Sequence, residues 1–406
     1  MAASAALRPG VEADAVDGVV PGAVAEPGTP EQLAAVLAEA SSAGRTTVVR
    51  GGGTKLGWGR VPARVDLLLS TARLAPVVVH RDGDLTATVS AGVSLADLNR
   101  QLAAKGQWLP VDSAFAGATI GGMLATNDAG PLRHRHGTAR DLLIGVRLAL
   151  TDGRLVKAGG TVVKNVAGYD LGRFVTGSFG TLAVIVEATF KLLPVPHASS
   201  TLVTAYASAE VLAANAAAIA ASQIEPLACD VHVPAAGRPS LLVRFASSPA
   251  ATRAQAATAR TMLVGETEEL SGDAERVRWT GQVQAAWAGQ AAVVRLSWMP
   301  ARLAEVLRLV EDLRGRTSGA LTLTARAIVG TGLLSVGGTP REQAAVVEHL
   351  RARTDLVGHV ALLRGGRELK AAVDVWGQAP SAQAALEALK RTFDPAGILN
   401  AARGPV

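Results

Sequence analysis

The alternation of apolar and polar residues predicts several helices. Three segments begin with a helix-capping pattern, at Thr29, Ser94 and Thr339. Apolar residues then recur at helical spacing, and glycine ends the first two segments at Gly44 and near Gly106. We therefore expect helices over these three segments.

Short runs rich in β-branched and other apolar residues lie between these helices. In the first half of the chain they cover residues 46–50, 86–91, 142–150 and 181–193. The order of strand, helix, strand and loop predicts a mixed α/β or α+β domain.

The composition changes at Pro194 and Pro196, which end a strand and stiffen a connector. Beyond them, residues 201–260 alternate between strand and helix patterns, 293–296 predict a strand, and 301–314 predict an amphipathic helix. This half indicates an antiparallel sheet covered by helices. We therefore predict an α+β fold with a flexible segment at residues 1–20, one domain at 21–196, and a second at 197–406 whose last helix returns to the first domain.

Composition excludes several classes of protein. The chain has 406 residues, of which 49% are hydrophobic and 18% charged, so it can bury large cores. Its net charge of +6 is modest, although residues 131–175 carry a local excess of Lys and Arg. That excess fits either a solvated loop face or a surface near phosphates or a docked subunit. It is not interleaved with aromatic residues, so we do not expect nucleic-acid binding.

Cys229 is the single cysteine, which excludes an internal disulfide, a Cys-ligated iron–sulfur cluster and a Cys-rich zinc site. No apolar run is long enough to span a membrane, and the first residues lack a signal-peptide pattern. The expected location is therefore the cytoplasm.

The strongest chemical signal is a glycine-rich loop directly after the predicted strand at 46–50. It reads Arg50-Gly51-Gly52-Gly53-Thr54-Lys55. Consecutive glycines let main-chain amides converge on an anion, and the residues that follow add a hydroxyl and a charge. The spacing is not that of a Walker A loop.

A second loop of small residues runs from Gly117 to Asn127 and again offers amides and short polar side chains. Two such loops in one domain can flank one diphosphate from both sides. A third segment, residues 177–185, passes from a glycine turn into an apolar strand that can support an aromatic ring system.

The order of these segments over residues 21–196 resembles the FAD-binding domain of the vanillyl-alcohol oxidase type, also called the PCMH type. Three further segments narrow the resemblance to the smaller FAD-binding subunit of bacterial glycolate oxidase. They are Lys164 to Asp170, Asp374 to Gly377, and Thr392 to Asn400.

The resemblance implies which residues contact FAD. The cofactor-binding set is predicted to be Arg50, Gly51, Gly52, Gly53, Thr54 and Lys55 in the first loop; Pro110, Gly117, Thr119, Gly121, Gly122, Thr126 and Asn127 around the second; and Gly180, Thr181, Val184 and Ile185 beside the flavin or adenine. Some family members attach FAD covalently through a His in the first loop, where this chain has Gly53. Non-covalent FAD is therefore predicted.

Two other candidate sites are less convincing. Ser178 follows Gly177 directly, so the segment is one residue short of a nucleophile elbow, and Ser178 is read as a turn residue. His134 and His136 have no third ligand nearby in sequence, and no metal is predicted. The second half also lacks the metal-binding pattern of related 2-hydroxy-acid enzymes. Whether the chain has a catalytic site of its own is therefore left open.

The resemblance implies oxidation of glycolate or a related 2-hydroxy acid by hydride transfer to flavin. Such a reaction needs a cationic clamp for the substrate carboxylate and a base for the hydroxyl proton. The candidates are Arg295, Arg326, Arg364 and His232, each beside apolar strand-like residues.

The resemblance also implies partners: a larger flavoprotein subunit, and an iron–sulfur subunit that takes electrons onward. Any membrane association would come through those partners. Two alternatives remain open, namely a self-sufficient FAD-linked dehydrogenase of another hydroxy acid or a sugar, and a non-catalytic scaffold stabilised by FAD.

Overall fold

The computed structural model describes residues 5–74, 76, 78–161, 170–377 and 380–405. The chain divides into two compact units. Unit 1 takes the described residues of Met1–Ala129, Gly137–Val195 and Gln378–Val406, and unit 2 takes Gly130–His136 and Pro196–Gly377.

The first sheet of unit 1 has the strand order β1-β2-β4-β3. Strands β2 (Ala23–Ala25), β4 (Leu67–Ser70) and β3 (Thr47–Arg50) are parallel, and β1 (Leu7–Pro9) is antiparallel to β2. Helix α1 (Pro30–Ser42) connects β2 to β3; the sequence predicted the helix and β3 but not β2.

Helix α1 forms where local chemistry favours it. The Thr29 hydroxyl accepts a hydrogen bond from the Gln32 amide, and Pro30 occupies the first turn. The apolar face of the helix buries Leu33 and Leu37 completely. Each such side chain contributes about 1.5–3 kcal/mol of transfer free energy.

Residues 7–14, which we expected to be part of a flexible segment at 1–20, make defined contacts. Residues 7–9 form β1, which pairs with β2, and the Asp14 carboxylate is buried between Arg8 and Arg50. The pair between Asp14 and Arg50 connects residues 36 positions apart in sequence, so no local pattern predicted it. The pKa of Asp14 is held well below its usual range, chiefly by the hydrogen bond from Arg8.

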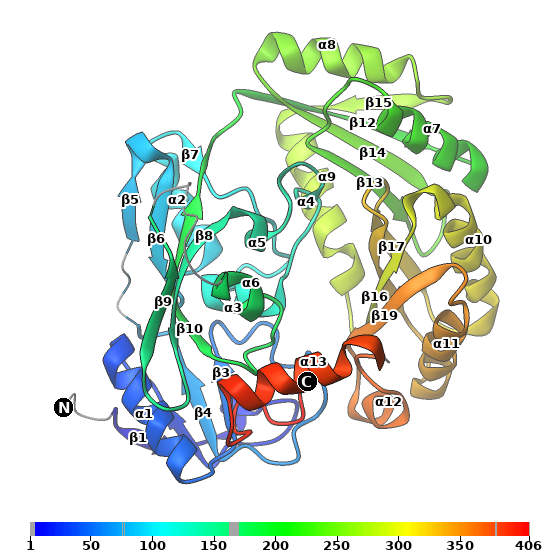
Figure 1. The fold of residues 1–406 in the computed structure, drawn as a ribbon. Helices are drawn as coiled ribbons and strands as arrows, with labels where there is room; N and C mark the ends of the chain where they lie inside the picture. The colour runs from blue at the N-terminus through cyan, green and yellow to red at the C-terminus, as the bar shows by residue number, and fades with distance from the viewer. Residues whose placement is uncertain (1–4, 75, 77, 162–169, 378–379, 406) are drawn as a thin grey trace. The chain divides into compact units, whose positions relative to one another are not determined.

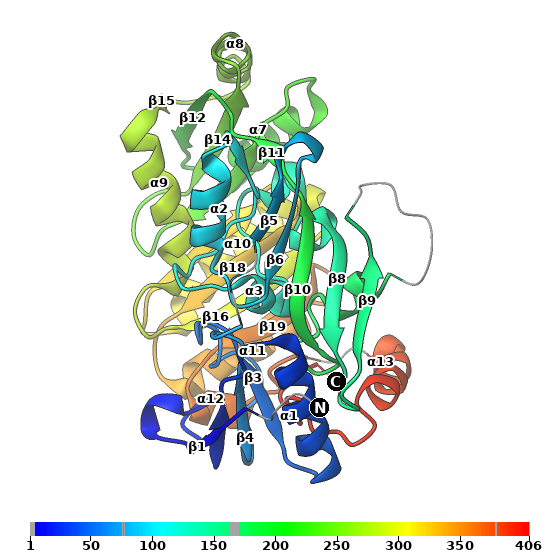
Figure 2. The ribbon, with the colours of Figure 1, turned by 90° about the vertical axis from the view of Figure 1, so that its left-hand side faces the viewer.

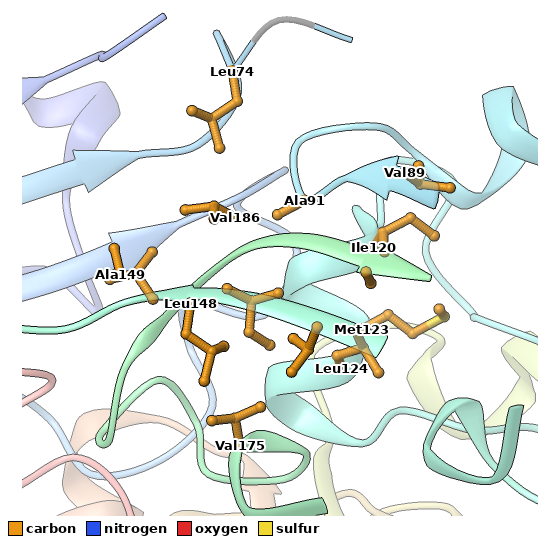
Figure 3. Packing of buried hydrophobic residues seen from close by; sticks show 14 of the residues in the cluster. Leu74, Val89, Ala91, Ile120, Met123, Leu124, Leu148, Ala149, Val175 and Val186 are labelled. Atoms are coloured by element: carbon orange, nitrogen blue, oxygen red, sulfur yellow. The ribbon is translucent and has the colours of Figure 1, made fainter. Parts of the chain in front are cut away.

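The second sheet of unit 1 is antiparallel, with the order β5-β6-β10-β8-β9 (Figure 2). One face of it packs against helix α3 (Ile120–Thr126), which contacts both β10 and β6. Figure 3 shows this core, in which Ile120, Met123 and Leu124 of the helix meet Ala91, Val89 and Val186. The strands are β5 (Val78–Arg81), β6 (Thr86–Ser90), β10 (Val184–Lys191), β8 (Leu143–Ala149) and β9 (Leu155–Gly159).

Short elements complete unit 1. Strands β7 (Gln107–Trp108) and β11 (Leu193–Pro194) pair, and the remaining helices are α2 (Leu95–Ala103), α5 (Ala139–Leu142), α6 (Leu171–Val175) and α13 (Pro380–Phe393). After α13, Leu399 forms a parallel bridge with Thr47 of β3, so the chain's last described residues extend the first sheet.

Unit 2 contains an antiparallel sheet with the order β15-β12-β14-β13-β17-β18-β16-β19. Helices α7, α10 and α11 follow one side of this sheet (Figure 1). The strands are β12 (Ala198–Ala205), β13 (Ala228–Val233), β14 (Ser240–Ser247), β15 (Thr267–Leu270), β16 (Ala292–Trp298), β17 (Leu321–Arg326), β18 (Thr331–Val336) and β19 (Val357–Arg364). The helices are α4 (Arg133–His136), α7 (Ala209–Ala221), α8 (Pro249–Arg260), α9 (Gly272–Gln284), α10 (Leu303–Leu313), α11 (Pro340–Ala352) and α12 (Arg367–Ala372).

The fold class is therefore α+β, as predicted, with an antiparallel sheet and helices in the second half. In the part of the chain that the structure describes, no helix is both long and apolar enough to cross a membrane. The motif at Lys164 to Tyr169 lies outside the described residues.

Candidate functional site

A pocket opens in unit 1 at the carboxyl end of β3. It contains about 860 Å³ of empty space, a volume that includes open solvent. Concave surfaces of this kind are typical of small-molecule and cofactor sites. Five segments line it: residues 49–58 around the first glycine loop, Thr71 after β4, Thr119 with both ends of α3, residues 179–185, and Asn400 with Arg403.

The first loop presents unused amide groups to this pocket. Gly51, Gly52, Gly53, Thr54 and Lys55 all line it. Among the described residues, none of their five main-chain N–H groups has a hydrogen-bond acceptor. Clustered free amides of this kind bind anions, because each N–H carries a partial positive charge.

The second loop uses its amides differently. The N–H of Ile120 donates to Val93 O, that of Gly121 to Ala91 O, and that of Gly122 to the Thr119 hydroxyl. These bonds hold the first turn of α3 against the end of β6. These three amides are therefore already bonded within the protein. What lines the pocket at the start of α3 is the helix surface and the Thr119 side chain.

The two loops touch each other. A Cβ on Gly52 would lie 1.9 Å from the carbonyl oxygen of Gly117, and one on Gly51 would lie 2.2 Å from the Thr119 hydroxyl. No real Cβ tolerates such distances, so glycine is required at both positions for the loops to approach. The sequence order suggested this proximity, but contact of both loops with one diphosphate stays a prediction.

The charged side chains of the first loop are already paired. Lys55 Nζ lies 3.0 Å from an Asp128 carboxylate oxygen, and both side chains are almost fully buried. Asp128 also accepts a hydrogen bond from the Ser113 hydroxyl. Arg50 Nη1 lies 2.9 Å from Asp14 Oδ1. Both cations of the first loop, Arg50 and Lys55, are therefore paired with carboxylates. Its hydrogen-bond donors without a partner among the described residues are main-chain amides.

Aromatic and apolar side chains form other parts of the wall. The rings of Trp58 and Phe179 both line the pocket, with centroids 6.4 Å apart. Val184 and Ile185 of β10 add an apolar surface. Such a surface can support a flat ring system and exclude water from it.

The chain's final segment supplies two polar residues. The Asn400 side-chain amide donates to Phe179 O at 2.6 Å. The Arg403 guanidinium donates to the carbonyls of Leu56, Trp58 and Arg60, and burial lowers its pKa to about 10. The tail is thus bonded to both the first loop and the glycine turn at residues 177–180.

Most of the predicted FAD-binding residues line this pocket, and four do not. Pro110 is buried beneath it, and Gly117 stands behind Gly52. Asn127 ends α3 in a left-handed conformation, and Thr181 donates its hydroxyl to Ser178 O within the glycine turn. Their assignment as cofactor contacts remains a prediction.

Sequence reasoning missed several lining residues, chiefly Trp58, Phe179, Asn400 and Arg403. Trp58 is close to the first loop in a chain poor in aromatic residues, so its position was a usable signal. Asn400 and Arg403 arrive from the far end of the chain, and only the fold brings them here.

The candidate substrate-binding residues lie in unit 2 and form two separate pairs. His232 on β13 and Arg326 on β17 occupy neighbouring strands. Arg326 Nε lies 3.7 Å from a carboxylate oxygen of the fully buried Asp230, whose pKa is raised by burial. Burial lowers the pKa of His232 to about 4, which keeps its imidazole neutral at pH 7.

Arg295 on β16 and Arg364 on β19 form the other pair, separated from the first by β18 in the sheet order. The Arg364 guanidinium donates to Trp287 O and Ala291 O and lies 5.7 Å from the Trp287 ring centroid. These carbonyl contacts hold the side chain and leave its positive charge in place. All four remain candidates for the substrate site.

Comparison with known proteins supports the interpretation that unit 1 contains an FAD-binding domain. Residues 21–159 match the family described as FAD binding domain. Over the whole fold, alkyldihydroxyacetonephosphate synthase superposes with a TM-score of 0.70 at 16% identity, covering 94% of this chain and 76% of that one. At this identity the likeness shows a shared fold.

Curated relatives resemble this chain over part of their length. Glycolate oxidase subunit GlcD of Bacillus subtilis is 35% identical over 208 residues, 51% of this chain and 44% of the relative. D-lactate dehydrogenase of Archaeoglobus fulgidus is 37% identical over 171 residues, 42% and 38% of the two chains. Glycolate oxidase subunit GlcE of Escherichia coli is 41% identical over 128 residues, 31% and 37%. The matched part therefore spans less than half of each relative.

The residues present fit FAD. Free amides at Gly51 to Lys55 can donate to diphosphate oxygens, which only accept hydrogen bonds at neutral pH. The apolar start of β10 suits a flat ring. A buried oxygen of Asn400 without a partner among the described residues offers an acceptor to a cofactor hydroxyl or N–H.

Proposed function

We propose that this chain is the FAD-binding subunit of a glycolate oxidase (glycolate dehydrogenase) complex that oxidises glycolate or a related 2-hydroxy acid to the 2-oxo acid. The observation that carries the proposal is the set of unbonded amides at Gly51 to Lys55, within the segment that matches an FAD binding domain. It accounts for diphosphate binding without a Walker A motif.

The names of the relatives support the substrate class. GlcD and GlcE are named as glycolate oxidase subunits, and the Archaeoglobus protein is named as a dehydrogenase of D-lactate, another 2-hydroxy acid. The ending at Thr392 to Asn400 supports the smaller-subunit assignment, because it belongs to the resemblance drawn from the sequence.

FAD, when bound, supplies the hydride acceptor for the carbon that bears the substrate hydroxyl. In this proposal the first-loop amides hold the diphosphate, and Val184 and Ile185 exclude water from the ring. A carboxylate clamp would come from Arg295, Arg326 or Arg364, and neutral His232 is a candidate to accept the hydroxyl proton.

We propose that FAD is held non-covalently. None of the described residues that line the pocket is a His or a Cys, and Gly53 occupies the place where the resemblance has a linking His. Cys229 is buried in unit 2, and burial raises the pKa of its thiol, which disfavours the reactive thiolate.

The proposal includes partners. One cysteine cannot ligate an iron–sulfur cluster, so electrons would pass to a cluster on another subunit. A larger flavoprotein subunit completes the proposed assembly, which we place in the cytoplasm with any membrane contact made through partners.

The test is purification of the chain alone and with its partners. We expect yellow protein with a flavin spectrum, whose colour is released by acid precipitation because no covalent bond holds it. Glycolate should bleach the flavin rapidly only after the partner subunits are added. Colourless protein that takes up no FAD on titration would refute the proposal.

A self-sufficient dehydrogenase is the second candidate, favoured by the match to D-lactate dehydrogenase. It predicts that D-lactate or another hydroxy acid bleaches the isolated chain within seconds. A non-catalytic scaffold predicts that the chain binds FAD, yet no substrate bleaches it and a reconstituted complex keeps its turnover when this chain's flavin is removed.

A further inference from the structure

Asn400 stands at an unusual place in unit 1. Its main-chain N–H donates to Thr47 O at 2.8 Å, directly after the bridge between Leu399 and Thr47. This position continues the first sheet beside β3, which leads into the first glycine loop. Residue 400 therefore enters the pocket wall although some 350 residues separate it in sequence from that loop.

The tail is fixed in place by contacts of its own. Lys390 Nζ donates to Thr181 O, Leu399 O and the Asp394 carboxylate. Asp394 in turn accepts from the amides of Ile398 and Leu399. The orientation of Asn400 is thus set by the protein and needs no ligand to form.

The two ends of the Asn400 carboxamide have different partners. Its Nδ2 donates to Phe179 O at 2.6 Å, and this fixes which end is nitrogen, because a carbonyl can only accept. Its Oδ1 is buried and has no hydrogen-bond partner among the described residues. The residue is 6% exposed and lines the pocket.

A buried acceptor without a donor is costly, so such atoms in native proteins are usually satisfied by water or a ligand. Backbone geometry gives another reason for asparagine here, since its φ of 44° lies in the left-handed region that Asn tolerates. That reason explains the residue type but leaves Oδ1 unsatisfied. The orphaned oxygen is the observation that points to a ligand.

We propose that Asn400 Oδ1 accepts a hydrogen bond from the non-phosphate part of the cofactor, and so divides the pocket into a donor end and an acceptor end. This deepens the proposed function and rests on its FAD site. The amides of Gly51 to Lys55 match phosphate oxygens, which carry no hydrogen at neutral pH. Asn400 Oδ1 needs an O–H or N–H, found on the sugars, the isoalloxazine imide or the adenine amine.

The test compares Asn400→Gly with Ala402→Gly in the full chain. Glycine keeps the left-handed backbone at residue 400 and removes the whole side chain, including the Nδ2 bond to Phe179 O. Ala402 is in the same tail, also has a positive φ of 59°, and does not line the pocket. Apo stability is followed by thermal unfolding, and affinities by titration with FAD, riboflavin, ADP and pyrophosphate, the last by competition.

We expect Asn400→Gly to weaken FAD binding about tenfold, the effect of one buried hydrogen bond. The same loss should appear with riboflavin or with ADP, but not with both, and pyrophosphate affinity should stay within twofold. Ala402→Gly should leave all four affinities unchanged.

Two results would overturn the inference while leaving the FAD site intact. In one, Asn400→Gly binds FAD as tightly as the unaltered chain, and Asn400 then serves the turn alone. In the other, all four ligands weaken by one common factor, which indicates a distorted pocket. Failure of the unaltered chain to bind FAD would instead overturn the proposed function, and this inference with it.

Discussion

The two glycine-rich loops of unit 1 look alike in sequence and differ in the use of their main-chain amides. In the first loop, residues 51–55 line the pocket, and their main-chain N–H groups have no acceptor among the described residues. At the start of α3, the amides of residues 120–122 donate hydrogen bonds to other atoms of the protein. The first loop therefore has amides available for a ligand, whereas those at the start of α3 are already bonded within the protein.

The glycines of both loops make room for other atoms of the protein. Gly51 and Gly52 lie against Thr119 and Gly117 of the other loop, whereas Gly121 lies against Ala91 in the core. A run of small residues therefore indicates close approach of backbone, and in both loops the approaching atoms belong to the protein. Substitutions at matched glycines test whether the loops also differ in their effect on FAD binding.

Gly52→Val should have the largest effect. Its Cβ would meet Gly117 O at 1.9 Å, backbone against backbone, so the first loop must move. Overpacking of this kind costs about 3 kcal/mol, which corresponds to a loss of roughly 100-fold in FAD affinity. Flavin absorbance per mole of purified chain measures it, and full flavin content would contradict the assignment of the first loop.

Lys55→Met should come next, and should act on stability. It leaves the Asp128 carboxylate, 3.0 Å from Lys55 Nζ and nearly buried, without its counter-ion. Breaking such a pair costs about 3 kcal/mol, read from urea unfolding of the apo protein. Adding Asp128→Asn should recover much of that loss. Lack of recovery would show that the loss of stability does not come from the unpaired Asp128 carboxylate.

Gly121→Ala should destabilise the fold by about 1–2 kcal/mol, because its Cβ would lie 2.8 Å from Ala91 Cβ (Figure 3 shows Ala91 beside α3). FAD affinity of the folded fraction should change less than threefold. This outcome separates the two loops. A large loss of FAD with unchanged stability would place the start of α3 in direct contact with the cofactor.

Gly53→Ala should cost about 1 kcal/mol of stability. The reason is its φ of 73°, since the nearest atom to an added Cβ, Arg50 Cδ, is a comfortable 3.8 Å away. Gly53→Asn should be milder, because Asn tolerates the left-handed region. Thermal unfolding of both variants measures the difference, and equal losses would point to a cause other than backbone strain.

Gly117→Ala should have the smallest effect. Its Cβ would meet only Thr54 Cγ2, at an ordinary 3.5 Å, and its φ is not positive. Stability should change by less than about 0.5 kcal/mol and FAD affinity by less than twofold. A large loss would show that the Gly117 carbonyl, which faces Gly52, has been displaced.

Local chemistry made much of the fold predictable. Helices α1, α2 and α11 begin at the capping residues Thr29, Ser94 and Thr339, because a cap acts within its own turn. Strand β3 ends where the glycines begin, so the position of the first loop was also readable.

The remaining features depend on partners distant in sequence. The amide of Gly121 is occupied because Ala91 O lies across from it, and Asp14 is buried because Arg8 and Arg50 surround it. Asn400 reaches the pocket only because Leu399 pairs with Thr47. No pattern within a window of the sequence contains such pairings, which explains why the pocket wall was only partly predicted.

The insertion of unit 2 between residues 195 and 378 of unit 1 has a consequence for biosynthesis. A ribosome makes residues 49–185 of the pocket early, but Asn400 and Arg403 emerge only after the whole of unit 2. Until then, strand β3 lies at the edge of the first sheet without Leu399 beside Thr47. An exposed strand edge of this kind is prone to pair with the wrong strand. On the proposed role of Asn400, cofactor binding at full affinity requires residues 400–403 to have been made and to have joined the pocket wall.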